Sequence, residues 1–384
     1  MGIREYKIHV SDDAIADLRA RLQAVRWPVV LDDTSWADGA SLTEIRQLVQ
    51  YWLHNFDWRS QEQRLNCLPQ FLLDVGGTDI HFVHQKGIGP APIPLILTHG
   101  WPGSFCEMEH ILPLLTDPGA HGGDPADAFD VVIPSLPGFG FSARPTKAGT
   151  SSKTIAMLWR ELMCELGYER FATQGGDIGA GVSMWLARLF PESILGAHVN
   201  YIPGSFKPGI VNVSQPVSAE ENSFLERAGR FSAEEGAYSA LQATKPQTLA
   251  FSLTDSPVGL AAWIAEKFHT WTDRRNAPQS GVPLDVLLTD ISLYWFSENV
   301  DASLRLYKEN RLNPLAFEVG ERVDVPLGVA VFPYELPTPP RSWVERVFPV
   351  TRWTEMPAGG HFAALEQPKL LAEDIRAFFR PLRQ

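Results

Sequence analysis

The sequence predicts an α/β protein with a mostly parallel, doubly wound sheet, an inserted helical segment and an N-terminal extension of helices and a hairpin. Two observations predict this class. Between residues 93 and 200, short apolar runs typical of buried strands alternate with segments that carry apolar residues at helical spacing. Such alternation favours parallel strands joined by helical crossovers. It stops near residue 201 and resumes near residue 325, which indicates helices inserted between strands of one sheet.

The composition is that of a globular protein. The chain has 384 residues, 45% of them hydrophobic and 20% charged, with a formal net charge of −12. A chain of this length buries a large core and is expected to hold more than one folding unit. The excess of negative charge argues against a surface for nucleic acid or for an anionic membrane.

The cysteines and the apolar runs bear on the compartment. Cys67, Cys106 and Cys164 make no disulfide framework or metal cluster, which is typical of a reducing compartment. The first ten residues lack the long apolar region of a signal peptide, and no apolar run is long enough to span a bilayer. We therefore expect a cytoplasmic protein without a membrane anchor.

Residues 1–90 are expected to form a packed extension. Ser11 is placed to cap a helix that runs to Val25, and Ser41-x-x-Glu44 is a capping box that opens a second helix. A hairpin is predicted next, with strands at residues 71–75 and 79–84 around two glycines. Packing against the rest of the chain is expected from the tryptophans of this region, which are Trp27, Trp36, Trp52 and Trp58.

The remaining elements complete the sheet and its insertion. Strands are predicted at residues 93–98, 129–134, 168–173, 194–200, 325–332 and 352–354, and helices at residues 152–166, 180–190 and 365–379. Residues 201–321 are rich in aromatic residues, are broken by prolines and lack strand patterns, so they are interpreted as a helical cap. The predicted parts are the extension (1–90), the core in two pieces (91–200 and 322–384) and the cap (201–321).

The turn between the strand at 168–173 and the helix at 180–190 reads Gly-Gly-Asp-Ile-Gly at residues 175–179. A strand that enters a helix through Gly-x-nucleophile-x-Gly is the nucleophile elbow of α/β-hydrolases. The turn is tight, so small residues flank the central one, and its side chain is exposed at the top of the sheet. Here the central residue is Asp177, where an esterase has serine. A glycine-rich loop with a solvated aspartate is the alternative interpretation.

An α/β-hydrolase presents its nucleophile, acid and histidine in that order along the chain. His361 is the candidate base, because it lies among small residues in a loop after the last predicted strand. Glu335 follows the end of the strand at 325–332 and is the candidate acid. Asp324 precedes that strand and so lies at the wrong end of the sheet, and Asn200, at the other usual position, carries an amide.

With these residues in place, the chain resembles the microsomal-type (juvenile-hormone-type) epoxide hydrolases over essentially its whole length. The hydrolase motifs are His-Gly-Trp-Pro-Gly at 99–103, Pro-Gly-Phe-Gly at 137–140 and the elbow at 175–179. These alone indicate only the superfamily. The combination becomes specific with motifs of the extension (26–28, 56–59, 64–66 and 69–71) and of the cap (244–246, 255–260, 266–268 and 307–310). The chain differs in lacking the membrane anchor of the animal members.

The resemblance implies a role for each site residue. Asp177 would open the epoxide and form an alkyl ester. Tyr238 and Tyr307 of the cap would hydrogen-bond the epoxide oxygen and protonate the leaving alkoxide. His361, oriented by Glu335, would activate the water that hydrolyses the ester.

The resemblance also implies an oxyanion hole for the second step. It would consist of the backbone N–H groups of Trp101 and Ile178. The family has a cis proline in this loop, which here is Pro102.

The expected activity is therefore conversion of an epoxide and water to a vicinal diol, without a metal or an organic cofactor. The aromatic cap favours a small apolar or aryl epoxide as substrate. A dehalogenase with an aspartate nucleophile is one alternative, but it would need halide donors, and the residue after its nucleophile is typically Trp or Arg, whereas here it is Ile178. A non-catalytic ligand-binding relative is the other. The particular epoxide, the selectivity and the oligomeric state, a homodimer among the options, stay open.

Overall fold

The computed structural model describes residues 2–31, 33, 35–209, 217–275 and 282–383. One nine-stranded sheet forms the centre of this part of the chain, in the order β1-β2-β3-β5-β4-β6-β7-β8-β9. Its strands are β1 (Arg4–Glu5), β2 (Gln70–Val75), β3 (Thr78–Gln85), β4 (Ile93–Thr98), β5 (Phe129–Pro134), β6 (Phe171–Gly175), β7 (Ile194–Val199), β8 (Leu327–Val331) and β9 (Val350–Glu355).

The sheet is antiparallel at one end and parallel elsewhere. Strands β1, β2, β3 and β5 pair antiparallel, whereas β5, β4, β6, β7, β8 and β9 pair parallel. The central strands are almost wholly buried and mostly apolar because helices cover both of their faces. The predicted mostly parallel sheet is confirmed.

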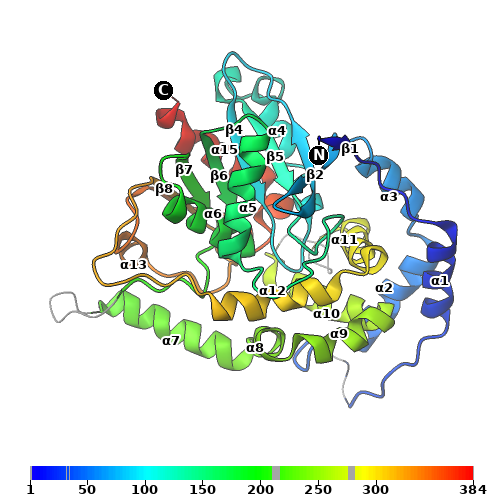
Figure 1. The fold of residues 1–384 in the computed structure, drawn as a ribbon. Helices are drawn as coiled ribbons and strands as arrows, with labels where there is room; N and C mark the ends of the chain where they lie inside the picture. The colour runs from blue at the N-terminus through cyan, green and yellow to red at the C-terminus, as the bar shows by residue number, and fades with distance from the viewer. Residues whose placement is uncertain (1, 32, 34, 210–216, 276–281, 384) are drawn as a thin grey trace.

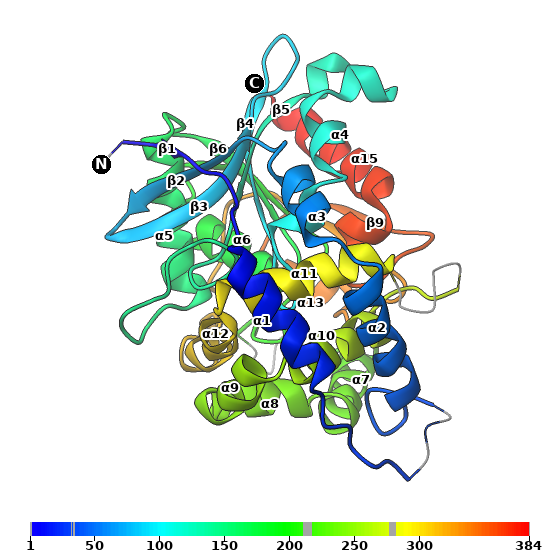
Figure 2. The same ribbon diagram turned by 90° about the vertical axis from the view of Figure 1, so that its right-hand side faces the viewer.

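Helices lie on both faces of the sheet (Figures 1 and 2). One face carries α5 (Ser152–Glu165) and α6 (Asp177–Leu189), and the other carries α4 (Leu112–Thr116) and α15 (Pro368–Phe379). This arrangement is the doubly wound one that the alternation of strands and helices predicts. Two short helices complete this region, α13 (Arg341–Glu345) and α14 (Ala363–Glu366), together with the 3-10 turns η1 (Phe105–Met108), η2 (Pro118–His121), η3 (Pro125–Asp127) and η4 (Arg380–Leu382).

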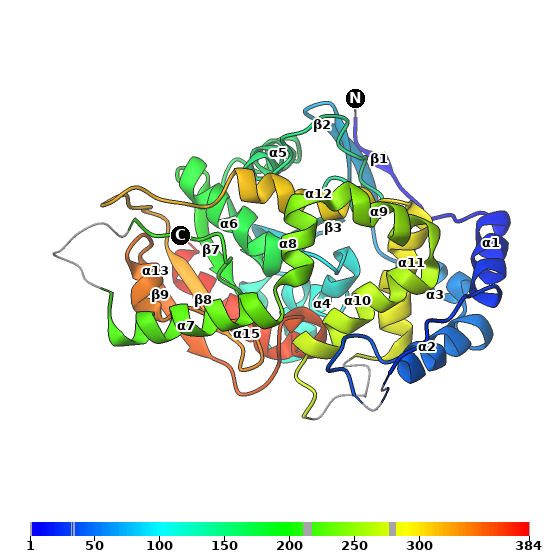
Figure 3. The same ribbon diagram turned by 90° about the horizontal axis from the view of Figure 1, so that it is seen from below.

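Between β7 and β8, the described residues form a layer of six helices that lies across the lower edge of the sheet (Figures 1 and 3). It comprises α7 (Ala219–Glu234), α8 (Ala237–Thr244), α9 (Pro246–Asp255), α10 (Pro257–Trp271), α11 (Leu284–Ser297) and α12 (Val300–Leu312). Pro246 and Pro257 each open a helix, where the missing N–H of proline has no cost. No helix among the described residues is long and apolar enough to cross a membrane.

The N-terminal helices α1 (Asp12–Gln23), α2 (Leu42–His54) and α3 (Trp58–Leu65) lie along the outer side of this helical layer (Figure 2). Ser11 caps α1 as predicted, with its hydroxyl accepting from Ala14 N at 3.2 Å. Ser41 caps α2 in the same way through Glu44 N at 3.3 Å. The Glu44 carboxylate, predicted to complete a capping box, instead accepts from the indole N–H of Trp36 at 2.8 Å.

Several boundaries differ from the predicted ones. Helix α1 ends at Gln23 and not at Val25. Strand β6 begins after the predicted residue 168, because Tyr168 N donates to Met163 O and so belongs to the turn that ends α5. Helix α6 begins at Asp177 itself and not at residue 180.

The predicted last helix at 365–379 is two helices, α14 and α15. Pro368 opens the second one, because it has no N–H to continue the hydrogen bonding of the first.

Candidate active site

Asp177 lies at the junction of β6 and α6, in a backbone conformation that few residues adopt. Its φ is 45°, in the left-handed region. The neighbouring glycines leave no room for side chains. A Cβ on Gly175 would lie 2.3 Å from the carbonyl carbon of Gly179, and one on Gly179 would lie 1.9 Å from Thr98 O. The tight turn predicted from the sequence is therefore present, and it points the Asp177 carboxylate out from the end of the sheet.

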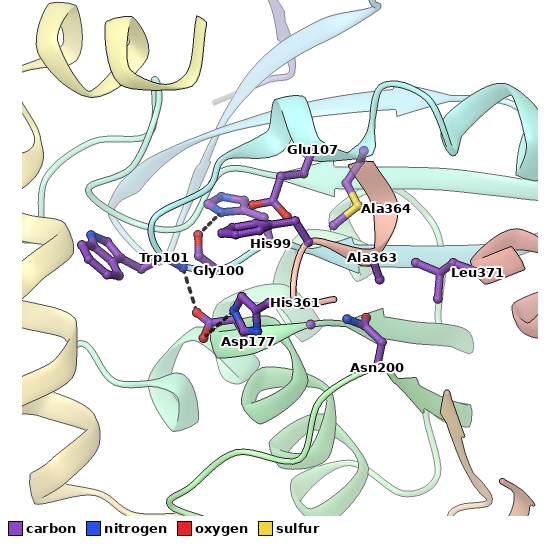
Figure 4. A pocket seen from close by; sticks show the side chains of 13 residues that line it. His99, Gly100, Trp101, Glu107, Asp177, Asn200, His361, Ala363, Ala364 and Leu371 are labelled. Atoms are coloured by element: carbon purple, nitrogen blue, oxygen red, sulfur yellow. Dashed lines mark hydrogen bonds and ion pairs between the residues drawn. The ribbon is translucent and has the colours of Figure 1, made fainter. Parts of the chain in front are cut away.

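One carboxylate oxygen of Asp177 is held by the loop that follows β4. The backbone N–H of Trp101 donates to Asp177 Oδ1 at 2.8 Å (Figure 4). The peptide bond between Trp101 and Pro102 is cis, as the resemblance implies. Ile178 is in the first turn of α6, where backbone N–H groups lack partners within the helix. Both N–H groups named from the sequence thus lie next to Asp177.

His99 anchors this loop. Its Nδ1 donates to Gly100 O at 3.1 Å, and its Nε2 accepts from Leu136 N at 3.2 Å. Burial lowers the pKa of His99 to about 4, so the ring is neutral and keeps both bonds. The histidine is therefore a structural support for the Trp101 N–H.

His361 lies between two carboxylates. Its Nδ1 is 2.5 Å from Glu335 Oε1, and its Nε2 is 3.5 Å from Asp177 Oδ2. The side chains of His361 and Glu335 are 2% and 1% exposed. Burial alone would lower the pKa of His361, but the charges and hydrogen bonds of Glu335 and Asp177 outweigh it and raise that pKa well above its usual value. The three residues predicted from chain order are therefore in contact.

The two predicted tyrosines lie above the same loop. Tyr238 of α8 stacks on the Trp101 indole, with ring centroids 5.5 Å apart, and Tyr307 of α12 meets that indole edge-on at 5.7 Å. The tyrosine rings are 5.9 Å from each other. Burial is the largest cause that raises the pKa of both hydroxyls well above 10, and the nearby charge of Asp177 also raises both. Both are therefore protonated, and they are available as donors over Asp177.

Two further groups at the site were not predicted. Tyr201, directly after β7, meets the His361 ring edge-on at 5.6 Å, and burial together with the charges of Asp177 and Glu335 raises its pKa. Glu107 of η1 lines a cavity of about 20 Å³ beside Asp177 and His361 (Figure 4). The end of β7 is a place where side chains gather in such sheets, so it offered a signal for Tyr201. Glu107 had none.

No cluster of three or more metal-ligating side chains is present among the described residues. The polar groups at the site are carboxylates, two imidazoles, an amide, tyrosine hydroxyls and backbone N–H groups. This set suits nucleophilic attack, proton transfer and stabilisation of an oxyanion.

Two protein families match the sequence. Residues 3–108 match the family described as "Epoxide hydrolase N terminus", and residues 93–214 match the "alpha/beta hydrolase fold". Among curated relatives, a putative epoxide hydrolase of Stigmatella aurantiaca is 44% identical over 100% of this chain and 86% of its own length. Epoxide hydrolase 1 of Oryctolagus cuniculus is 38% identical over 98% of this chain and 88% of its own length. Juvenile hormone epoxide hydrolase 1 of Ctenocephalides felis is 35% identical over 98% of this chain and 85% of its own length.

Solved structures agree with these relatives. The epoxide hydrolase of Aspergillus niger superposes with a TM-score of 0.86 at 29% identity, covering 100% of this chain and 97% of its own. The juvenile hormone epoxide hydrolase of Bombyx mori also superposes with a TM-score of 0.86, at 28% identity, covering 100% of this chain and 95% of its own. With full-length identity of up to 44% and a fold shared from end to end, the chain belongs to the microsomal-type (juvenile-hormone-type) epoxide hydrolase family of the α/β-hydrolase superfamily.

Proposed function

We propose that this epoxide hydrolase converts its substrate through a covalent ester on Asp177, with Asp177, His361 and Glu335 as a catalytic triad. The observation that carries the proposal is the asymmetry of the Asp177 carboxylate. Trp101 N–H holds Oδ1 at 2.8 Å, whereas the polar contact of Oδ2 within the described part of the chain is the longer one of 3.5 Å to His361. Oδ2 is therefore the oxygen available to attack carbon, and Oδ1 stays in place as the carbonyl oxygen of the ester.

In the first step, Oδ2 attacks a ring carbon and the carbon–oxygen bond of the epoxide breaks. The leaving oxygen takes a proton from Tyr238 or Tyr307, whose raised pKa values keep them protonated until that moment. General-acid assistance of this kind contributes roughly 10²- to 10⁴-fold in rate. The two tyrosines belong to the helical layer α7–α12, which we propose acts as a cap over the triad.

Alkylation also prepares the second step. The negative charge of Asp177 is one of the causes that raise the pKa of His361, and it disappears when the ester forms. The pKa of His361 then falls, and the proton it releases replaces the one given up by the tyrosine. Neutral His361 takes a proton from water, whose oxygen attacks the ester carbonyl. The oxyanion at Oδ1 is stabilised by Trp101 N–H and Ile178 N–H, as preorganised donors do in other hydrolases.

The substrate class follows from the residues around the tyrosines. Trp101, Trp271, Tyr238 and Tyr307 form one aromatic cluster above Asp177. Such a wall favours an apolar or aryl epoxide over a polar one, because burial of apolar surface drives binding. The cytoplasmic location and the homodimer stay predictions of the sequence.

The reaction class is tested by comparing substrates. Styrene oxide should give its diol, and 1-chlorobutane or fluoroacetate should release no halide at a comparable rate, because the site presents hydroxyl donors for an alkoxide. Halide release as fast as epoxide opening would reverse the assignment in favour of a dehalogenase.

A further inference from the structure

We propose that Glu107 holds the water molecule that hydrolyses the ester, in the small cavity beside Asp177 and His361. The proposal rests on the covalent mechanism above and adds a positioning residue to it. In Figure 4, Glu107 comes from one side of the cavity, Asp177 and His361 lie on the opposite side, and Asn200 lies beside them.

The cavity is the right size for one water. Its volume is about 20 Å³, and a buried water needs roughly 10–15 Å³ and two to four polar partners. Glu107, Asn200 and His361 are among the lining residues whose side chains offer polar atoms. Apolar residues such as Leu371 close the other side. A water held here lies next to the carbonyl that it must attack and to the base that must take its proton.

The amide of Asn200 is oriented by a neighbour. Its Oδ1 accepts from Gln174 Nε2 at 2.9 Å, which leaves Nδ2 as the group beside Gly176. A Cβ on Gly176 would lie 2.7 Å from that Nδ2, so glycine keeps the approach open. Asn200 therefore donates a hydrogen bond to the water oxygen through Nδ2, while its Oδ1 accepts from Gln174.

Glu107 offers an acceptor for the second proton of the water, and the fold makes room for it. A Cβ on Gly103 would lie 1.3 Å from Glu107 Oε1, so the carboxyl group occupies the space that a side chain at 103 would fill. Glu107 as a whole residue is half-buried, and it lines the cavity. One water proton then points to His361 Nε2 and the other to Glu107, and a lone pair of the water oxygen faces the ester carbon.

The charge of Glu107 is compatible with this role. Burial raises the pKa of Glu107 well above its usual value, and the nearby carboxyls of Asp290 and Asp177 raise it further, whereas His361 lowers it. Asp290 is itself buried, with its pKa raised to about 7. A neutral Glu107 accepts through its carbonyl oxygen without adding a second negative charge next to the oxyanion.

The step balances as follows. The water oxygen bonds to the ester carbon while one of its protons moves to His361 Nε2. The tetrahedral oxyanion collapses, and the bond between the acyl carbon and the diol oxygen breaks. That oxygen takes the proton from His361. The other proton of the water, now on the Asp177 carboxyl, then moves to His361 Nε2, which regenerates the Asp177 carboxylate and protonated His361, while Glu107 stays neutral throughout.

The test separates alkylation from ester hydrolysis with styrene oxide as the probe, by stopped-flow tryptophan fluorescence and intact-protein mass. In Glu107→Leu we expect alkylation within about two-fold of wild type and hydrolysis slowed on the order of 10- to 10²-fold, as for other small misplacements of a reactant. The ester then accumulates. Glu107→Gln should restore hydrolysis to within a few-fold, because its amide oxygen accepts the same proton.

The matched control is Glu109→Leu, since Glu109 is on the same turn but pairs with Arg64. It should leave both steps unchanged. If Glu107→Leu does not fold, Glu107→Asp takes its place, because it draws the carboxyl back by one methylene and should slow hydrolysis in the same way. Unchanged hydrolysis in the variant, or an equal fall in both steps, would overturn the role of Glu107.

His361→Gln is measured in parallel, so that a failure of the role of Glu107 can be distinguished from a failure of the covalent mechanism. If His361→Gln accumulates ester and Glu107→Leu does not, the role of Glu107 is wrong and the covalent mechanism stands. If neither variant forms an adduct while both fold and bind the epoxide, the covalent mechanism fails and this inference fails with it.

Discussion

Asp177 combines a strained backbone with the chemistry of the site. A non-glycine residue in the left-handed region costs about 1–3 kcal/mol, and Asp is among the residue types that tolerate it best. The φ of 45° exposes the carboxylate beyond the strand ends, and Trp101 N–H then holds one oxygen at 2.8 Å. The two oxygens therefore have different contacts, and in the proposed mechanism Oδ1 stays in place and Oδ2 attacks.

The tyrosines permit a direct test of the first step. Tyr238→Phe or Tyr307→Phe keeps the aromatic packing but removes one donor to the alkoxide, so alkylation should slow roughly 10- to 10³-fold. The double variant should be nearly inactive and still folded. The control is Tyr168→Phe, because Tyr168 donates to Asp130 at 2.7 Å and has no part in the site. Single-turnover alkylation measures the effect, and an unchanged rate in the double variant would make both hydroxyls structural.

The pH dependence of the second step has a definite sign. Ester hydrolysis needs neutral His361, so its rate should fall about tenfold per unit as pH drops below the pKa of His361 in the alkyl-enzyme. Glu335 raises that pKa. Glu335→Gln should therefore move the midpoint of hydrolysis to lower pH, in pre-steady-state measurements between pH 5 and 9. A midpoint that moves upward would show that Glu335 does not act through the charge of His361.

At the scale of elements, the N-terminal segment is part of the fold. It supplies β1, β2 and β3 to the sheet, and its helices contact the helical layer. Arg21 pairs with Asp255 at 3.0 Å, and the ring of Trp36 stacks on His269 at 3.8 Å. The segment thus connects the sheet to the helices that carry the tyrosines.

Deletion of residues 1–90 should therefore give insoluble or molten protein. The truncation exposes the edge of β5 and the apolar faces against which the lost helices pack, and such surfaces aggregate. Near-UV circular dichroism and dye binding would report the loss of packing. A soluble and active chain that begins near Pro92 would contradict this expectation.

The elements that could be predicted are those with a long apolar pattern. Strands β4 and β5 and the start of α5 fall at the predicted residues, since each is a continuous buried run or a clear amphipathic helix. Strand β1 has only two residues and no pattern of its own, so pairing with β2 alone defines it. Asp177 and His361 carry local motifs. Tyr201 follows the end of a predicted strand, which was a signal for it, whereas Glu107 reaches the site through tertiary folding, which no local pattern records.

At the scale of the whole molecule, buried neutral histidines predict loss of stability in acid. Burial lowers the pKa of His81 to about 3 and that of His99 to about 4, whereas the unfolded chain binds a proton near 6.5. Between pH 6.5 and 4 the unfolded state therefore takes up protons that the folded state cannot, and stability should fall by about 1.4 kcal/mol per pH unit for each histidine. The pKa of His361 is raised and not lowered, so the stability that this histidine contributes is present in acid and is lost as pH rises.

Urea unfolding at several pH values measures this slope. His81→Gln removes one of the two groups, so its stability should fall less steeply with acid than that of the wild type, by about 1.4 kcal/mol per unit. His121 is exposed, so His121→Gln is the control and should leave the dependence of stability on pH unchanged. Equal slopes in the wild type and His81→Gln would contradict the assignment.

The origin of the oxygen in the first diol tests the covalent mechanism most directly. A single turnover is run in ¹⁸O-water with enzyme in excess, and the diol and the peptide that contains Asp177 are weighed by mass spectrometry. If Asp177 attacks first, the diol receives the oxygen of its carboxylate and is unlabelled, and the label enters Asp177. Labelled diol from the first turnover, with no label in Asp177, would show that water attacks the epoxide directly.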